Sequence, residues 1–111
     1  MRPARLLSAA ALTIMLSQCA PECAPPAPAP ITHEARWDRI ARCESGGNWS
    51  HPPVTNRTGT YSGGLMIWQK AWISYGGQEF APWAYQATKA EQVVVAERIW
   101  AQYGAGAWDC K

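Results

Sequence analysis

The first 30 residues of this chain are not suited to forming a packed core, so any folded domain must be built from the remainder. Met1 to Arg5 is basic, and Leu6 to Leu16 is an apolar run without a charged residue. Pro21 to Pro30 is rich in proline and alanine, a composition that favours extended polyproline II. About 80 residues are left, and domains of that size often need a disulfide or another covalent support.

A basic start followed by a short apolar run is typical of a secretory signal peptide, and the run is too short for an ordinary transmembrane helix. We therefore expect a signal peptide at residues 1–20, a Pro/Ala-rich linker at 21–33 and a folded domain at 34–111. The protein would be secreted or held in the cell envelope. The segment before Cys19 is similar to a lipoprotein signal, although Gln18 stands where a small residue is usual. Plain secretion, a lipid anchor at Cys19 and an uncleaved membrane anchor all remain open.

Four cysteines are present, two in the export region and two that bracket the rest of the chain. Neither a C-x-x-C motif nor a Cys/His ligand pattern occurs, so we expect no metal site and no cofactor. In an oxidising compartment the natural pair is Cys43 with Cys110. Closing so long a loop is worth at most about 4 kcal/mol, a large share of the stability of a small domain. Cys23 is left without an assigned role.

Composition limits the classes of partner. The net charge is +2 and the cationic side chains are scattered, so we expect no nucleic-acid partner. Seven tryptophans stand against one phenylalanine. Such rings either fill a small core or stack on the apolar face of a sugar. No long apolar surface is evident, and we expect a monomer.

Local patterns predict mostly helix with little strand. Apolar spacing predicts a helix over Glu34–Glu44, stopped by the glycines that follow. A glycine-rich stretch over Thr58–Leu65 predicts a short hairpin, and a second helix is expected over Ile67–Tyr75. Thr88 begins a capping box that opens the last helix, and Gly104 ends it. The expected fold class is therefore α+β, mostly α, with a short β-hairpin and one disulfide.

Residues 37–49, Trp-Asp-Arg-Ile-Ala-Arg-Cys-Glu-Ser-Gly-Gly-Asn-Trp, resemble the opening of the catalytic domain of resuscitation-promoting factors. These are secreted, lysozyme-like proteins of high-GC Gram-positive bacteria. The resemblance spans essentially all of residues 34–111. It continues in order through Tyr61, Gly63-Gly64-Leu65, Gln69, Trp72, Gly76-Gly77, Glu79-Phe80-Ala81-Pro82, Gln86-Ala87-Thr88, Val95-Ala96-Glu97-Arg98, Gly106-Ala107-Trp108 and Cys110.

The resemblance implies a small truncated lysozyme-like fold with a Cys43–Cys110 bond. It implies action on peptidoglycan glycan strands, at the β-1,4 bond between N-acetylmuramic acid and N-acetylglucosamine, by a lytic transglycosylase or a muramidase. Family members promote regrowth of dormant cells, often beside a peptidoglycan endopeptidase. By position, Glu44 takes the place of the family's catalytic glutamate. Two departures remove polar groups near the sugar cleft: Met66 replaces a usual glutamine and Ala71 a usual threonine.

Glu44 is chemically suited to that role. It ends a predicted helix, where the dipole is negative, beside a cysteine and near a tryptophan, so its pKa should be raised. Glycosidic cleavage needs such a protonated carboxyl. No second carboxylate is convincing, because Asp38 lies on another face of the helix and Asp109 and Glu79 read as solvated charges. A single acid fits transglycosylation, in which the muramyl 6-hydroxyl attacks, while hydrolysis by water stays open.

Other candidates are less specific. Trp49, Tyr61 and Trp72 either line the cleft or pack in the core, and Gln69 is a candidate to bind an acetamido group. His33 and His51 have no partner at a useful spacing. Two alternative functions remain: a catalytically weak peptidoglycan-binding or signalling module, and a phage-borne lysin.

Overall fold

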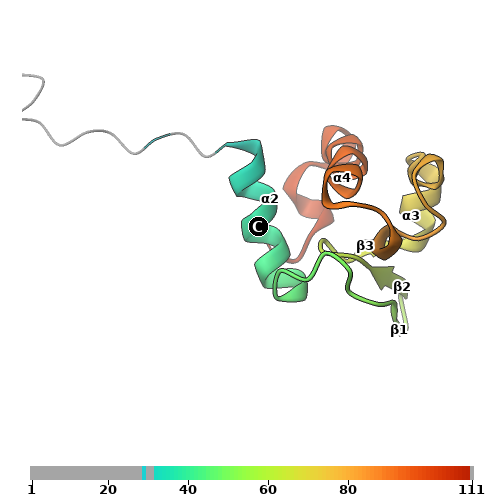
Figure 1. The fold of residues 1–111 in the computed structure, drawn as a ribbon. Helices are drawn as coiled ribbons and strands as arrows, with labels where there is room; N and C mark the ends of the chain where they lie inside the picture. The colour runs from blue at the N-terminus through green and yellow to red at the C-terminus, as the bar shows by residue number, and fades with distance from the viewer. Residues whose placement is uncertain (1–28, 30–31, 111) are drawn as a thin grey trace, which may run out of the picture. The chain divides into compact units, whose positions relative to one another are not determined.

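A computed structural model describes residue 29 and residues 32–110 of the chain. The predicted signal peptide, Cys19, Cys23 and most of the predicted linker lie outside these residues. The described part is α+β and mostly helical (Figure 1). Its helices and strands are α2 (His33–Ser45), β1 (Val54–Asn56), β2 (Gly59–Ser62), β3 (Ile67–Trp68), α3 (Gln69–Ser74) and α4 (Lys89–Tyr103), with short 3₁₀ turns η1 (Gly77–Glu79), η2 (Ala84–Gln86) and η3 (Gly104–Ala107).

Helix α2 extends the predicted helix by one residue at each end. The hydroxyl of Thr32 accepts a hydrogen bond from the backbone N–H of Ala35 at 3.1 Å and so caps the first turn. At the other end Gly46 has a φ of 69°, a left-handed conformation that glycine adopts without strain. The apolar face points into the core, where Trp37, Ile40 and Ala41 are buried.

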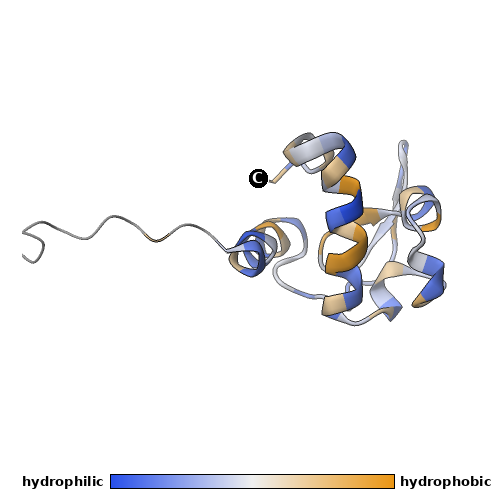
Figure 2. Cartoon of the chain, turned by 90° about the horizontal axis from the view of Figure 1, so that it is seen from above, coloured by the Kyte–Doolittle hydropathy of each residue, from blue (hydrophilic) through white to orange (hydrophobic). Residues whose placement is uncertain are grey.

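Helix α4 confirms the predicted capping box. The backbone N–H of Glu91 donates to the Thr88 hydroxyl at 3.2 Å, and the Glu91 carboxylate accepts from the Thr88 backbone N–H at 2.8 Å. Figure 2 shows hydrophobic segments along this helix, interrupted by hydrophilic ones. Val95, Ala96 and Ile99 are its buried apolar residues. Among the helices that the structure describes, none has both the length and the apolar composition required to cross a bilayer.

The strands correct the predicted hairpin and second helix. Strands β1 and β2 form the hairpin, with Val54 opposite Tyr61, so it begins before the predicted Thr58. A third strand, β3, pairs with β2 and completes an antiparallel sheet in the order β1-β2-β3. Residues 67 and 68 were predicted as the start of a helix, but both are strand, and α3 begins at Gln69. Ile and Trp favour strands, and here a neighbouring strand offers its backbone for pairing.

Tryptophans form much of the core. Trp37 packs edge-on against Trp100 and Trp108, with ring centroids 5.5 Å and 5.0 Å apart. Trp72 is fully buried, and the indole N–H of Trp108 donates to the carbonyl of Leu65 at 3.0 Å. The predicted Cys43–Cys110 disulfide is present and joins residues 67 positions apart, with a Cα–Cα distance of 5.8 Å. It brings the end of the chain back to α2 (Figure 1).

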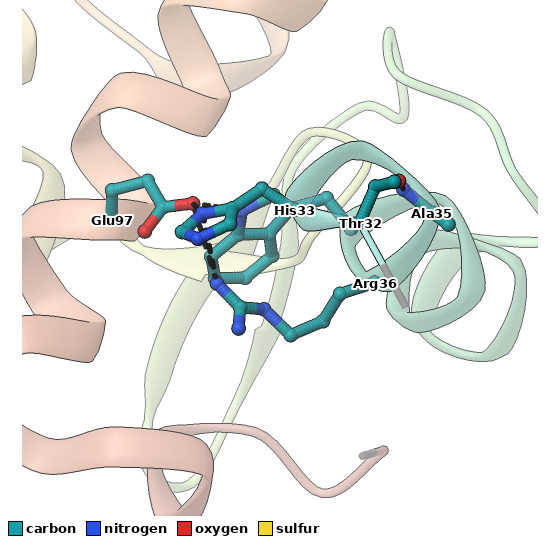
Figure 3. A network of polar contacts seen from close by, with 6 residues as sticks. Thr32, His33, Ala35, Arg36 and Glu97 are labelled. Carbon is teal, nitrogen blue, oxygen red and sulfur yellow. Dashed lines mark hydrogen bonds and ion pairs between the residues drawn. The ribbon is translucent and has the colours of Figure 1, made fainter. Parts of the chain in front are cut away.

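One carboxylate oxygen joins α2 to α4 (Figure 3). Oε1 of Glu97 accepts from the indole N–H of Trp37 at 2.6 Å and lies 2.8 Å from Nδ1 of His33 and 3.4 Å from the Arg36 guanidinium. His33 therefore has a partner that sequence spacing did not reveal, because that partner lies 64 residues away. Burial disfavours the charged form of Glu97. The hydrogen bonds from Trp37 and His33 and the charges of His33 and Arg36 outweigh that effect and lower its pKa.

Replacing Glu97 with Gln should lower the free energy of unfolding at neutral pH and make that free energy depend less on pH under acidic conditions. A lowered folded-state pKa stabilises the fold above the ordinary value of 4.5, and this contribution is lost as pH falls through the folded pKa. We expect a loss of about 1 kcal/mol at pH 7 and a smaller difference from the wild type near pH 3. Urea denaturation at several pH values measures both. Glu34→Gln, on the exposed side of α2, is the control, and equal pH profiles for wild type and Glu97→Gln would contradict the assignment.

Removing the disulfide with Cys43→Ala and Cys110→Ala together should lower the free energy of unfolding by up to about 4 kcal/mol. The cause is the greater conformational entropy of an unfolded chain that is no longer cross-linked. Thermal and urea denaturation measure the loss, and Cys23→Ser serves as the cysteine control. A double variant as stable as the control would show that core packing alone holds the tail.

Candidate active site

Glu44 lies in the last turn of α2 and is held from the opposite side by the end of the chain. The backbone N–H of Cys110 donates to its Oε1 at 3.1 Å. Since Cys43 is its neighbour and is bonded to Cys110, the disulfide holds this donor in place. The Glu44 side chain is half-buried. It is therefore oriented by the protein and still reachable from solvent.

The end of α2 is tied to the segment that joins β2 and β3. The Ser45 hydroxyl lies 3.0 Å from the carbonyl of Ala41 and 2.8 Å from that of Gly64. Asn48 accepts from the backbone N–H of Ser50 at 3.0 Å and so shapes the following turn. The helix end is thereby positioned against the sheet, which places Glu44 beside β1 and β2.

The pKa of Glu44 is raised above its ordinary value of 4.5. Burial is the largest cause. The hydrogen bond from the Cys110 backbone opposes it, the negative charge of Asp109 raises the pKa further, and the Asp109 backbone N–H lowers it. The direction is the one that the sequence predicts, and Asp109 is an additional cause. Asp109 is exposed, as expected, but it faces Glu44 and is not an isolated surface charge.

Two pockets that share part of their lining lie at this site, and we call them together the groove. The Glu44 pocket has a volume of about 300 Å³ and is lined by Glu44, Asp109, Asn56 and Thr58 among others. The second, which we call the aromatic pocket, measures about 740 Å³ and extends along β3 and α3 to the end of α4. Four residues line both: Tyr61, Met66, Ala107 and Trp108. The groove therefore runs from the carboxyl group past the sheet.

Of the four side chains proposed from sequence to bind substrate, the structure places Tyr61 in the groove. Trp49 packs over Gly64, where an added Cβ would lie 2.5 Å from its ring. Trp72 is fully buried and donates to the carbonyl of Ala81 at 2.9 Å. These two rings act in packing, and neither lines a described pocket.

Gln69 is also outside the groove. Its side-chain amide donates to the carbonyl of Pro82 at 3.0 Å, and its Oε1 atom is buried. The side chain therefore braces the segment before η2 and does not line either of the two pockets. Among the residues that the structure describes, no group of three His, Cys, Asp or Glu side chains is placed to bind a metal ion.

The groove contains three residues that sequence reasoning did not assign to it: Trp68, Trp108 and Asp109. Met66 and Ala71, which the sequence analysis placed near the sugar cleft, also line it. Met66 has a φ of 48°, an unusual value for a residue other than glycine. Sequence reasoning missed Trp68 because it predicted a helix at this position. The residue lies instead in β3, a strand that forms by pairing with β2.

Replacing Asp109 with Asn should lower the pKa of Glu44, because it removes a neighbouring negative charge that disfavours ionisation. The change can be followed by NMR titration of the Glu44 carboxyl carbon in wild type and variant. Asp38→Asn, which alters a carboxylate paired with Lys89 away from the groove, is the matched control. An unchanged or raised Glu44 pKa in Asp109→Asn would contradict this arrangement.

Comparison with known proteins agrees with the geometry. A family profile described as a transglycosylase-like domain matches residues 31–111. Resuscitation-promoting factor Rpf1 of Corynebacterium glutamicum is 48% identical over 99 residues, which are 89% of this chain and 48% of that protein. Two proteins of Mycobacterium tuberculosis are also similar. RpfA is 48% identical over 75 residues (68% of this chain, 17% of that protein), and RpfE is 40% identical over 81 residues (73% and 43%).

The chain thus spans about half the length of Rpf1 and less of the two mycobacterial proteins. The profile covers all of the described helices and strands. The chain belongs to the transglycosylase-like domain family, and residues 31–111 form a resuscitation-promoting factor domain.

Proposed function

We propose that this chain cleaves the glycan strands of peptidoglycan at the β-1,4 bond between N-acetylmuramic acid and N-acetylglucosamine, with Glu44 as the general acid and base. The observation that carries the proposal is a half-buried carboxyl with a raised pKa, fixed by the Cys110 backbone at one end of a groove. A raised pKa favours the protonated carboxyl, and a glycosidic leaving group requires such a proton donor. The family description and the names of the relatives support the same activity.

In the proposed reaction Glu44 donates its proton to the glycosidic oxygen. The bond from that oxygen to the muramyl C1 breaks, and the electron pair leaves with the oxygen as a 4-hydroxyl. The carboxylate of Glu44 then removes the proton of the muramyl 6-hydroxyl, and this oxygen bonds to C1 to close a 1,6-anhydro ring. Glu44 ends protonated, as it began. The substrate supplies its own nucleophile at high effective concentration.

Hydrolysis is the second candidate outcome, and Asp109 is the observation that favours it. Its carboxylate shares the Glu44 pocket and is close enough to raise the Glu44 pKa. A negative charge there would stabilise positive charge on the sugar ring. A pair of carboxyl groups is also the usual equipment of glycosidases that use water. The product would then carry a reducing end.

The wider setting extends the same proposal. A signal peptide over residues 1–20 would export the chain, and the Pro/Ala-rich segment over 21–33 would hold the catalytic domain, 34–111, away from a membrane or from a lipid anchor at Cys19. The monomeric domain would then act in the cell envelope. Its cleavage of old wall would support regrowth of dormant cells, alongside a peptidoglycan endopeptidase that cuts the peptides.

Replacing Glu44 with Gln should reduce cleavage of purified peptidoglycan by about 10²-fold or more, because the amide keeps the shape and cannot donate the proton. Mass spectrometry of the digest measures the loss and identifies the ends. Anhydro ends indicate transglycosylation, and reducing ends indicate hydrolysis. Glu79→Gln is the matched control, since Glu79 pairs with Arg98 outside the groove.

Full lytic activity in a folded Glu44→Gln variant would overturn the catalytic assignment. Binding of glycan and stimulation of dormant cells without any lysis by the wild type would support the alternative of a binding or signalling module. Circular dichroism of each variant establishes that its fold is retained.

A further inference from the structure

The two pockets of the groove differ in charge. The Glu44 pocket contains two carboxyl groups, Glu44 and Asp109, and no cation among its lining residues. The aromatic pocket has the opposite character: its described lining includes no aspartate or glutamate and one cation, Lys70. Its remaining surface is largely aromatic and aliphatic. A ligand that fills the whole groove is therefore complementary to the aromatic pocket if it places an apolar face and a negatively charged group there.

Trp68 presents a fixed ring at this end. It lies in β3 opposite Tyr61, and 39% of its surface is exposed. The ring packs directly over Gly59, where an added Cβ would lie 2.1 Å from its Nε1 atom, so the glycine is required for this position. Both Trp68 and Tyr61 line the aromatic pocket. An exposed indole held in one orientation suits stacking on the apolar face of a sugar ring.

Lys70 places an uncompensated charge beside that ring. Its Nζ lies 5.7 Å from the centroid of Trp68. None of the ion pairs formed by the described residues includes Lys70. Lys89 is a useful contrast: its Nζ lies 5.4 Å from the ring of Trp49, but it is paired with Asp38 at 2.6 Å. The charge of Lys70 is thus available to a ligand and that of Lys89 is not.

We propose that the aromatic pocket binds a saccharide unit that carries an acidic peptide, with Trp68 stacked on the sugar and Lys70 paired with a peptide carboxylate. This inference rests on the proposed function and narrows its substrate to peptide-bearing strands. A neutral saccharide would satisfy the ring and leave Lys70 without a partner. The departures at Met66 and Ala71 agree with this, because both line the same pocket and leave apolar contact as the dominant interaction with the sugar.

The test measures binding to the full chain carrying Glu44→Gln, so that no turnover occurs. Three oligosaccharides of equal length are compared by isothermal titration calorimetry: one with acidic peptides, one whose peptide carboxylates are converted to amides, and one without peptides that keeps the lactyl carboxylate. We expect the acidic-peptide form to bind about five-fold more tightly than the amidated form, as for one exposed ion pair. This preference should weaken as salt concentration rises.

Adding Lys70→Gln should abolish the preference and leave binding of the amidated form within two-fold of its former value, roughly the limit set by loss of one surface charge. Trp68→Ala should weaken all three ligands about ten-fold, and Trp68→Phe should restore part of that loss. Lys89→Gln is the matched control and should change nothing. Together these results would establish the subsite.

Equal binding of acidic and amidated forms, or a preference that survives Lys70→Gln, would overturn the inference while glycan binding and the proposed function stand. A Lys70-dependent affinity for the peptide-free strand equal to that for the acidic-peptide strand would also overturn it, because the sugar's own carboxylate would then be the partner. Failure of all three ligands to bind would reject the groove itself and with it the proposed function.

Discussion

The Cys43–Cys110 disulfide is the constraint on which the site depends. It fixes the end of the chain against the last turn of α2, one residue from Glu44. That position delivers the Cys110 backbone N–H and the Asp109 charge to the carboxyl group. The same tail brings Trp108 against Trp37 in the core and along the wall of the groove. In so small a domain one covalent bond thereby joins the core, the groove and the acid.

The elements that sequence predicts well are those whose signals are local. Thr88 and Glu91 satisfy each other's backbone within one turn, and Gly46 ends α2 through its own conformation, so neither requires knowledge of distant residues. The start of the predicted second helix failed for the opposite reason. Residues 67 and 68 become strand because β2 lies beside them, and pairing with a neighbouring strand is a non-local property.

The same distinction divides the site. Glu44 could be proposed as a candidate from sequence because it lies in a contiguous stretch, residues 37–49, that carries the family resemblance. The packing of Trp49 and Trp72 could not be predicted in this way, because only the fold brings Gly64 against the ring of Trp49 and Gly77 against the ring of Trp72. Asp109 and His33 gained roles from partners that lie 64 or more residues away.

The proposed function requires a small domain to hold a long glycan in this groove. Stacking on Trp68 and contact with Met66 would stabilise a bound sugar through buried apolar area, and this depends little on the pattern of the sugar's hydroxyl groups. Buried hydrogen-bonding groups would discriminate more sharply between sugars, because a buried polar group left without a hydrogen-bond partner costs binding free energy. A groove with Met66 and Ala71 therefore leaves selectivity to charge, which resides at its two ends: Glu44 with Asp109 at one, Lys70 at the other.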